Sequence, residues 1–142
     1  GVKKGTQIDR VLLAGKVFGN SSALIKLEEI LHPMVSEMRN QFVSSVKSDL
    51  VVFDIPLLFE KSYENECDMI VVVTAPAAVQ KERVLSRPSM TEKRFQNILN
   101  KQMPDDKKRE KADFIIQTDK GFDYAKTQVR HIINEIRNDA DA

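Results

Sequence analysis

The stretch that decides the fold runs Val51-Val52-Phe53-Asp54-Ile55-Pro56-Leu57-Leu58-Phe59-Glu60. Its apolar run ends in a carboxylate at Asp54, and Pro56, which has no backbone N–H, prevents that run from continuing as a central strand. An acidic residue at the carboxyl end of a buried parallel strand is where phosphoryl-transfer enzymes hold magnesium. Asp54 is therefore a candidate for the acid beside Mg²⁺, and an ordinary carboxylate that caps a turn is the alternative.

Short β-branched runs without alternation are typical of strands covered on both faces, and they occur at residues 50–53, 69–73 and 114–116. Apolar residues at steps of three and four predict helices around them. The expected helices span residues 7–18, 23–47, 77–86, 91–102 and 122–136, with Pro33 as a break or kink in the second and a turn at 103–106. Strands separated by helices predict an α/β fold with a parallel sheet.

Composition narrows the class of protein. The 142 residues predict one domain with a helical annex, and their net charge of +1 does not favour a general nucleic-acid binder. Cys67 is alone, which argues against a disulfide framework and favours a reduced, cytoplasmic setting. No apolar run approaches the length needed to span a bilayer, so no membrane partner is expected.

Positive charge gathers in one region. Residues 80–111 hold ten Lys/Arg against five acidic residues, a local surplus that fits a phosphate-rich small ligand. Arg83 and Arg87 are four residues apart and so share a helical face, and Arg94 follows on the next helix. Guanidinium groups bind phosphates with bidentate geometry, so these arginines are a candidate phosphate clamp. Solvated helix arginines are the ordinary alternative.

Several motifs follow one another along the chain: Ile8-Asp9-Arg10, Val17-Phe18, residues 27–35, 54–60 and 71–76, then Gln80, Arg83, Arg87, Arg94 and Gln102, and finally residues 112–116 with Gly121. Together they resemble the dephospho-coenzyme A kinase family over almost the whole chain. The resemblance implies a P-loop-kinase-like parallel sheet with a helical coenzyme-A-binding subdomain at residues 1–48. The remaining α/β core would span 49–142, with a lid around 80–103.

The resemblance also implies an activity, the transfer of the ATP γ-phosphoryl group to the ribose 3′-hydroxyl of dephospho-coenzyme A. Catalysis of this kind is mostly positioning and charge stabilisation. Asp54 would lie beside Mg²⁺, through water, and Arg87 would reach the transferring group. Arg83, Arg94 and Gln117 would bind ATP, although Gln117 stands where the family usually has Asn. The substrate side would be formed by Arg10, His32, Pro33, Leu57 and Leu58.

One departure from the family is large. Its members begin with a strand, a Gly-x-x-x-x-Gly-Lys-Ser/Thr loop and a second strand, about 60 residues at roughly 30 residues per βα unit, and none of these is present. In the family sheet the absent first strand lies between the strands expected near 50–55 and 69–74. We expect the two exposed edges to close up, to pair in a homo-oligomer or to await a missing segment. We also expect this chain alone to be catalytically inactive.

Three alternatives stay open at this point. A non-catalytic homologue could bind coenzyme A or a partner protein without the phosphate loop. A nucleoside-monophosphate kinase shares the sheet and the arginine lid, although the helical insertion before residues 56–60 argues against it. A purely structural α/β module leaves the clustered arginines unexplained.

Overall fold

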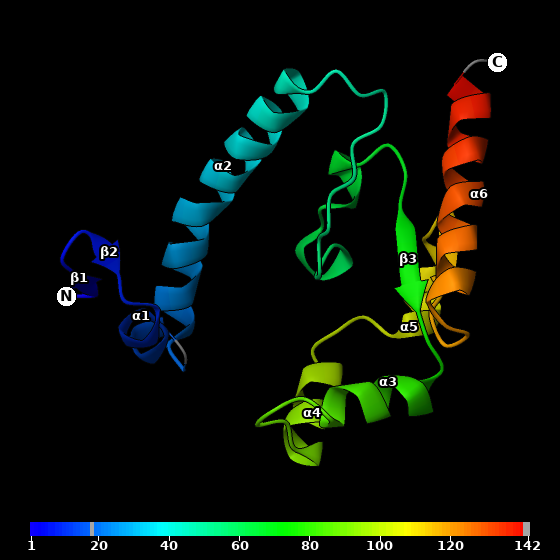
Figure 1. The fold of residues 1–142 in the computed structure, drawn as a ribbon. Coiled ribbons are helices and arrows are strands. Elements are labelled where there is room, and N and C mark those ends of the chain that lie inside the picture. The colour runs from blue at the N-terminus through cyan, green and yellow to red at the C-terminus, as the bar shows by residue number, and fades with distance from the viewer. Residues whose placement is uncertain (18, 141–142) are drawn as a thin grey trace. The chain divides into compact units, whose positions relative to one another are not determined.

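The computed structural model describes residues 1–17 and 19–140. Phe18, which belongs to one of the family motifs, lies outside the described residues. Contacts divide the chain into two compact units, Gly1–Phe53 and the residues from Asp54 onward, and each is described by itself (Figure 1). None of the described helices combines the length and the apolar character needed to cross a bilayer.

The first unit is a small hairpin followed by two helices. Strands β1 (Lys3–Lys4) and β2 (Gln7–Ile8) pair antiparallel. Helix α1 (Arg10–Val17) begins later than the helix expected from residue 7. The reason is Asp9, whose Oδ1 accepts hydrogen bonds from the backbone N–H groups of Val11 and Leu12 at 3.0 and 3.1 Å, so that it caps the helix.

Helix α2 (Ser21–Ser45) is capped by Asn20, whose side chain accepts from the Ala23 N–H. The helix continues through Pro33, so of the expected break or kink, the break is wrong. Proline removes one backbone hydrogen bond, and the long helical runs on both sides carry the helix past this gap.

The expected strand at 50–53 is also wrong, since residues 50–55 take no regular structure. A strand needs a neighbour for its backbone groups, and no described strand pairs with this segment. Val52 is 81% exposed as a result. Phe53 instead meets the Phe42 ring of α2 edge-on, with centroids 6.4 Å apart.

The second unit is built on two parallel strands, β3 (Val71–Thr74) and β4 (Phe114–Gln117), in the register Val71↔Phe114 to Thr74↔Gln117. This confirms the α/β fold with a parallel sheet. Ahead of β3 lie two 3₁₀ turns, η1 (Phe59–Lys61) and η2 (Glu64–Glu66). The buried side chains of this unit are Phe59, Val72, Phe95, Ile116 and Ile132.

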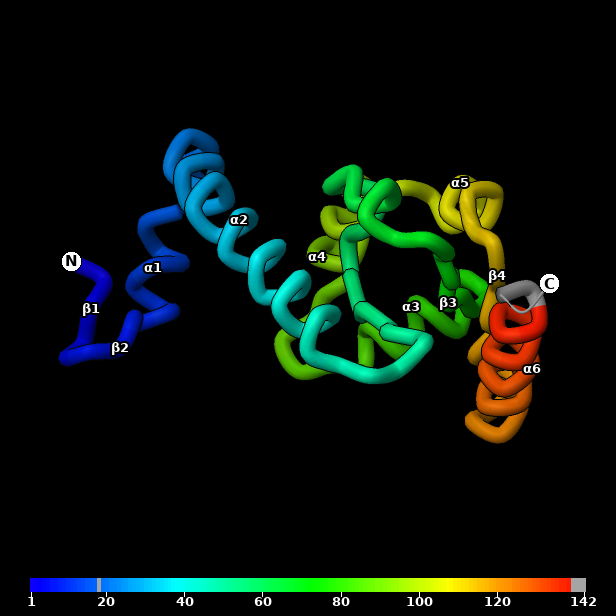
Figure 2. Tube along the Cα trace, turned by 90° about the horizontal axis from the view of Figure 1, so that it is seen from above, coloured from blue at the N-terminus to red at the C-terminus, as the bar shows by residue number. Residues whose placement is uncertain are grey.

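The helices of the second unit are α3 (Ala77–Leu85), α4 (Glu92–Leu99), α5 (Asp105–Glu110) and α6 (Phe122–Ala140). Helices α3 and α4 lie beyond the carboxyl end of β3 (Figure 1), and α6 lies along β4 (Figure 2). Sequence reasoning missed α5 and expected only a turn. Pro104 precedes this helix and two aspartates open its first turn, which suits the positive end of the helix dipole.

Candidate active site

The carboxyl ends of the two strands open into a polar groove of about 300 Å³. This is the edge at which open α/β sheets bind ligands. Thr74 ends β3 and donates from Oγ1 to Asp105 Oδ1 at 2.7 Å, and Asp105 Oδ2 pairs with Arg109 Nε at 3.2 Å. The groove is lined by Thr74, Ala75, Pro76, Ala77, Gln80, Asp105, Arg109, Gln117 and Asp119.

Gln117 has its backbone held from outside the sheet. Its N–H donates to Gln128 Oε1 at 3.0 Å, and its carbonyl accepts from Gln128 Nε2 at 2.9 Å. The α6 side chain thus pairs with Gln117 as a neighbouring strand would. Of the residues expected to bind ATP, Gln117 is the one that lines the groove.

Arg83 ties helix α3 to the end of β4. Its Nη1 donates to Thr118 Oγ1 at 3.0 Å and its Nη2 donates to the Thr118 carbonyl at 2.7 Å. Thr118 Oγ1 in turn donates to the Thr74 carbonyl at 3.1 Å. Thr118 therefore joins β3, β4 and α3 at one point, and two donors of the Arg83 guanidinium are already used.

The structure sorts the ten cations of residues 80–111. Five of them pair with acidic side chains: Lys81 with Glu92, Lys107 with Glu110, Lys108 with Glu60, Arg109 with Asp105 and Lys111 with Glu64. Arg83 binds Thr118, and Arg94 Nη1 donates to the Ser89 carbonyl at 3.3 Å. Within the described residues, Arg87, Lys93 and Lys101 make no hydrogen bond or ion pair through their side chains, so three charges of the cluster remain for a ligand.

Helices α3 and α4 are joined across a tight turn. Lys81 Nζ pairs with Glu92 Oε1 at 2.9 Å, and this hydrogen bond lowers the pKa of Glu92. Thr91 caps α4 by accepting from the Arg94 N–H. The turn contains Ser89 at a φ of 63°, a left-handed conformation that holds Arg87 and Pro88 in a defined bend between the helices.

Asp54 is exposed and lies in irregular backbone. No described residue donates a hydrogen bond to it or forms an ion pair with it. The turn that follows is better fixed, because Phe59 is buried and the Lys61 N–H donates to the Leu57 carbonyl at 3.1 Å. Leu57 remains 38% exposed. Asp54, Arg87 and Arg94 do not line the groove.

Glu60 is a largely shielded carboxylate, with its side chain 13% exposed, and its partner Lys108 is 20% exposed. Its Oε1 accepts from the Met103 N–H at 2.8 Å and from Lys108 Nζ at 2.8 Å. Burial by itself would raise the pKa of Glu60, but these two hydrogen bonds and the Lys108 charge outweigh it and lower the pKa below the usual value.

The carboxylate that the family resemblance places beside a metal ion is Asp54. The described residues hold no group of three or more His, Cys, Asp or Glu side chains placed to bind a metal. Mg²⁺ bound by substrate phosphates needs only one or two protein carboxylates and keeps several waters. The unpaired carboxylate of Asp54 fits that limited role.

In the first unit, the residues expected on the substrate side are Arg10, His32 and Pro33. Arg10 opens α1, and His32 and Pro33 lie within α2. All three are exposed. They form no described cluster with one another.

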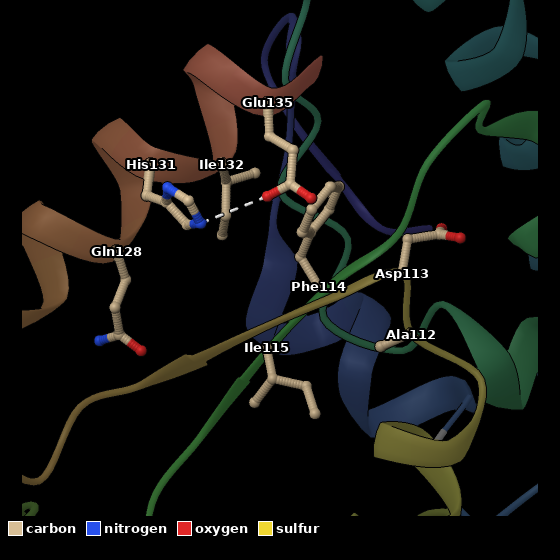
Figure 3. Close-up of a pocket in the computed structure, with 8 residues that line it drawn as sticks. All are labelled: Ala112, Asp113, Phe114, Ile115, Gln128, His131, Ile132 and Glu135. Atoms are coloured by element: carbon tan, nitrogen blue, oxygen red, sulfur yellow. Dashed lines mark ion pairs between the residues drawn. The ribbon is translucent and has the colours of Figure 1, made fainter. Parts of the chain in front are cut away.

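A second cavity, of about 440 Å³, lies between α6 and the amino half of β4 (Figure 3). Phe114 points toward α6, and Ile115 points to the other side of the strand. His131 Nε2 and Glu135 Oε2 are 3.4 Å apart, and Asp113 Oδ2 accepts from the Ile70 N–H at 2.7 Å. These polar groups serve the helix and the strand end and form no catalytic set.

Sequence reasoning missed Thr74, Asp105 and Asp119 at the groove, and Thr118 beside it. Thr74 directly follows the apolar run at residues 69–73, and Asp105 begins a helix. Thr118 and Asp119 come two and three positions after the apolar run at residues 114–116. Polar residues at strand carboxyl ends were the signal that could have found them.

The comparisons with known proteins agree with one another. The family model described as Dephospho-CoA kinase matches residues 2–123. The dephospho-CoA kinase of Bartonella quintana is 46% identical over 139 residues, which cover 96% of this chain and 71% of that protein. The dephospho-CoA kinase of Mesorhizobium japonicum is 46% identical over 133 residues, covering 92% of this chain and 68% of the relative.

Two solved structures share the fold. A Thermus thermophilus protein of known crystal structure aligns with a TM-score of 0.79 at 28% identity, over 93% of this chain and 69% of that one. The dephospho-CoA kinase from Campylobacter jejuni aligns with a TM-score of 0.57 at 29% identity, over 95% of this chain and 68% of that one.

Proposed function

Because the chain belongs to the dephospho-CoA kinase family, we propose that it phosphorylates dephospho-coenzyme A with ATP as co-substrate. The phosphoryl acceptor is the ribose 3′-hydroxyl. The observation that carries the assignment to this site is the polar groove at the strand ends, which has Gln117 in its wall and lies beside the Thr118 anchor of α3.

The groove is the proposed nucleotide side. Gln117 and Gln80 offer amide donors and acceptors, and Asp119 accepts hydrogen bonds. Arg94 stands on α4 beyond the bend, where its remaining donors can serve ATP. Arg83 can offer ATP only the donors that Thr118 leaves free.

Arg87 is the proposed ligand of the transferring phosphoryl group. It lies one turn beyond Arg83 on the lid, and no described carboxylate neutralises it. A free guanidinium held on a lid stabilises charge that develops on the transferring oxygens. Asp54 would accept hydrogen bonds from the waters of Mg²⁺, and that ion, when bound, neutralises phosphate charge.

The acceptor, dephospho-coenzyme A, would bind at the residues that follow Asp54 in the chain. Leu57 and Leu58 offer an apolar wall after the Pro56 turn, and Leu57 remains available to a ligand. We assign Arg10, His32 and Pro33 to the same substrate, within a helical subdomain at residues 1–48. The remainder, 49–142, forms the core with its lid around 80–103.

The proposed partners are therefore ATP and dephospho-coenzyme A, in the cytoplasm, with neither nucleic acid nor membrane involved. A second copy of the chain is a further proposed partner. The support for it is the uncovered edge of β3, where Val73 is 62% exposed.

Because this chain alone is expected to be inactive, the test is transfer of labelled γ-phosphoryl from ATP to dephospho-coenzyme A by an extended chain, in which the family's first strand, phosphate loop and second strand precede residue 1. Binding of each ligand is measured beside it by calorimetry. Wild type is compared with Asp54→Asn and with Asp68→Asn, a matched exposed aspartate. We expect transfer to fall at least tenfold in Asp54→Asn and to be unchanged in the control. Binding of coenzyme A without transfer would instead support a non-catalytic homologue, and full activity of Asp54→Asn would refute the metal-side role.

A further inference from the structure

Glu60 closes the stretch at residues 51–60, yet the proposed reaction gives it no task. Its carboxylate is mostly buried and accepts from two different segments, the Met103 N–H and Lys108 Nζ, each at 2.8 Å. Glu60 Oε2 is sealed from solvent and has no hydrogen-bond partner among the described residues. Burial of a carboxylate oxygen without a hydrogen-bond partner costs free energy. A glutamate in this position therefore calls for an explanation beyond an ordinary charged surface residue.

The two ends of this contact belong to different functional parts. On one side the backbone is stiff from Leu57 onward: Lys61 N–H donates to the Leu57 carbonyl and Tyr63 N–H to the Leu58 carbonyl, at 3.1 and 3.0 Å. Phe59 is buried between them. A displacement of the leucine wall is therefore passed on to Glu60.

On the other side, Met103 marks the exit of the lid. Helix α4 ends at Leu99, and Gln102 N–H still donates to the Leu99 carbonyl at 3.0 Å. Met103 follows directly and leads into α5, which carries Lys108. The entrance of the lid is held separately, by Arg83 on Thr118.

We propose that Glu60 is a positioning residue that couples the substrate loop Pro56–Leu58 to the exit of the lid. Dephospho-coenzyme A bound against Leu57 and Leu58 then sets where the lid ends, and through it where Arg87 stands. This inference rests on the proposed function. It adds an order to it, since the lid takes its working position only when the acceptor is present.

The chain offers a matched control in Glu64. It lies on the same segment, pairs with Lys111 beyond the end of α5 at 3.8 Å, and also has a buried unpartnered oxygen. It makes no described contact with the lid exit. A purely structural account predicts a loss of folded protein in either variant with both KM values unchanged, whereas coupling predicts a change in KM for dephospho-coenzyme A in the Glu60 variant alone.

The kinetic test compares Glu60→Ala, Glu60→Gln and Glu64→Ala, each in the extended chain that carries the family's phosphate loop. Glu60→Ala should raise KM for dephospho-coenzyme A and lower kcat, each about tenfold, with KM for ATP within about twofold, because misplaced groups lose transition-state contacts. Glu60→Gln keeps an acceptor for Met103 and should recover most of the loss. If Glu60→Ala only lowers kcat through fewer folded molecules, with both KM values unchanged, the coupling is refuted.

A second measurement needs no turnover. Hydrogen exchange is followed in residues 54–61 and 92–103, free and with dephospho-coenzyme A. In wild type the ligand should slow exchange in both segments, and in Glu60→Ala only in the first. Protection of both segments in Glu60→Ala overturns the proposal.

If the ligand protects neither segment in wild type, the proposed function fails for this chain. The coupling is then tested by hydrogen exchange of the ligand-free variants. Glu60→Ala must then speed exchange at 92–103 at least tenfold over Glu64→Ala. Equal rates in the two variants would refute the coupling by themselves.

Discussion

At the scale of single residues, a cation that is paired with a carboxylate stabilises the fold, whereas an unpaired cation can bind a phosphate. The cations of α5 are bound to acidic side chains, so they serve the fold. Arg87 has no such partner among the described residues, and it sits beside a fixed bend. It is therefore the cation of the lid best suited to a phosphate.

Arg87→Ala should lower the rate of phosphoryl transfer on the order of 10²–10³-fold, as the loss of one donor to a developing charge typically does. Lys93→Ala is the control, since Lys93 is another exposed cation of the same segment without a described partner. Steady-state kinetics of the extended chain with both substrates measures the effect. Equal losses in the two variants would mean that net charge, and not position, matters.

The pH dependence of stability should report Glu60. Its pKa is lowered in the folded chain from 4.5, so the carboxylate stabilises the fold above pH 4.5, and this contribution is lost as pH falls through the folded-state pKa. Urea unfolding of wild type and Glu60→Gln should differ by about 1–3 kcal/mol at neutral pH and converge in acid. Glu110→Gln, at an exposed pair, should differ little at any pH; a gap for Glu60→Gln that persists in acid would contradict the assignment.

At the scale of elements, the helices were largely predictable and the sheet was only partly so. The helices expected at residues 77–86 and 91–102 correspond to α3 and α4 in the structure. A helix satisfies its backbone groups internally, so its sequence is enough to predict it. A strand depends on a neighbour that the local sequence does not contain, which is why Val51–Phe53 reads as a strand and is not one.

The candidate site shows the same division. The family resemblance, and not the local pattern, assigned Gln117 and Arg83 to the nucleotide side, and the structure has Gln117 in the groove wall. The Arg83–Thr118 bonds could not be predicted, because they join residues 35 positions apart. The outcome for Asp54 relative to Arg87 stays a prediction.

Thr118→Val should weaken the attachment of α3 to the strand ends, because it removes the hydroxyl that accepts from Arg83 Nη1. Loss of the Oγ1 contacts to Arg83 and to the Thr74 carbonyl should cost about 1 kcal/mol per bond and speed amide exchange in α3, while Thr118→Ser retains both. The control is Thr127→Val, whose hydroxyl bonds only within α6. Unchanged exchange in α3 would show that the Thr118 hydroxyl does not anchor this helix.

At the scale of the whole molecule, the outer edge of β3 pairs with no described strand. Backbone groups alternate in direction along a parallel ladder, and Phe114 N–H bonds to Ile70 and Thr118 N–H to Thr74. The groups of Val71 and Val73 therefore face away from β4. Such an edge is a template for another strand.

We expect the chain to associate with itself through this edge as concentration rises. Val73→Lys should suppress association, since a lysine on an edge strand is a common natural block. Val129→Lys, on α6, should not. Sedimentation velocity over a range of concentrations measures both, and a wild-type chain that stays monomeric throughout would rule out edge pairing.

The Gln128 clamp on Gln117 decides how far such assembly can go. Because this clamp occupies the β4 edge at Gln117, we expect pairing through the β3 edge, and two copies related by a two-fold axis would then form a closed dimer. Gln128→Ala would also free the backbone N–H and carbonyl of Gln117 at the edge of β4. The same chain should then polymerise into open-ended filaments, which light scattering would register as turbidity where the parent stays clear.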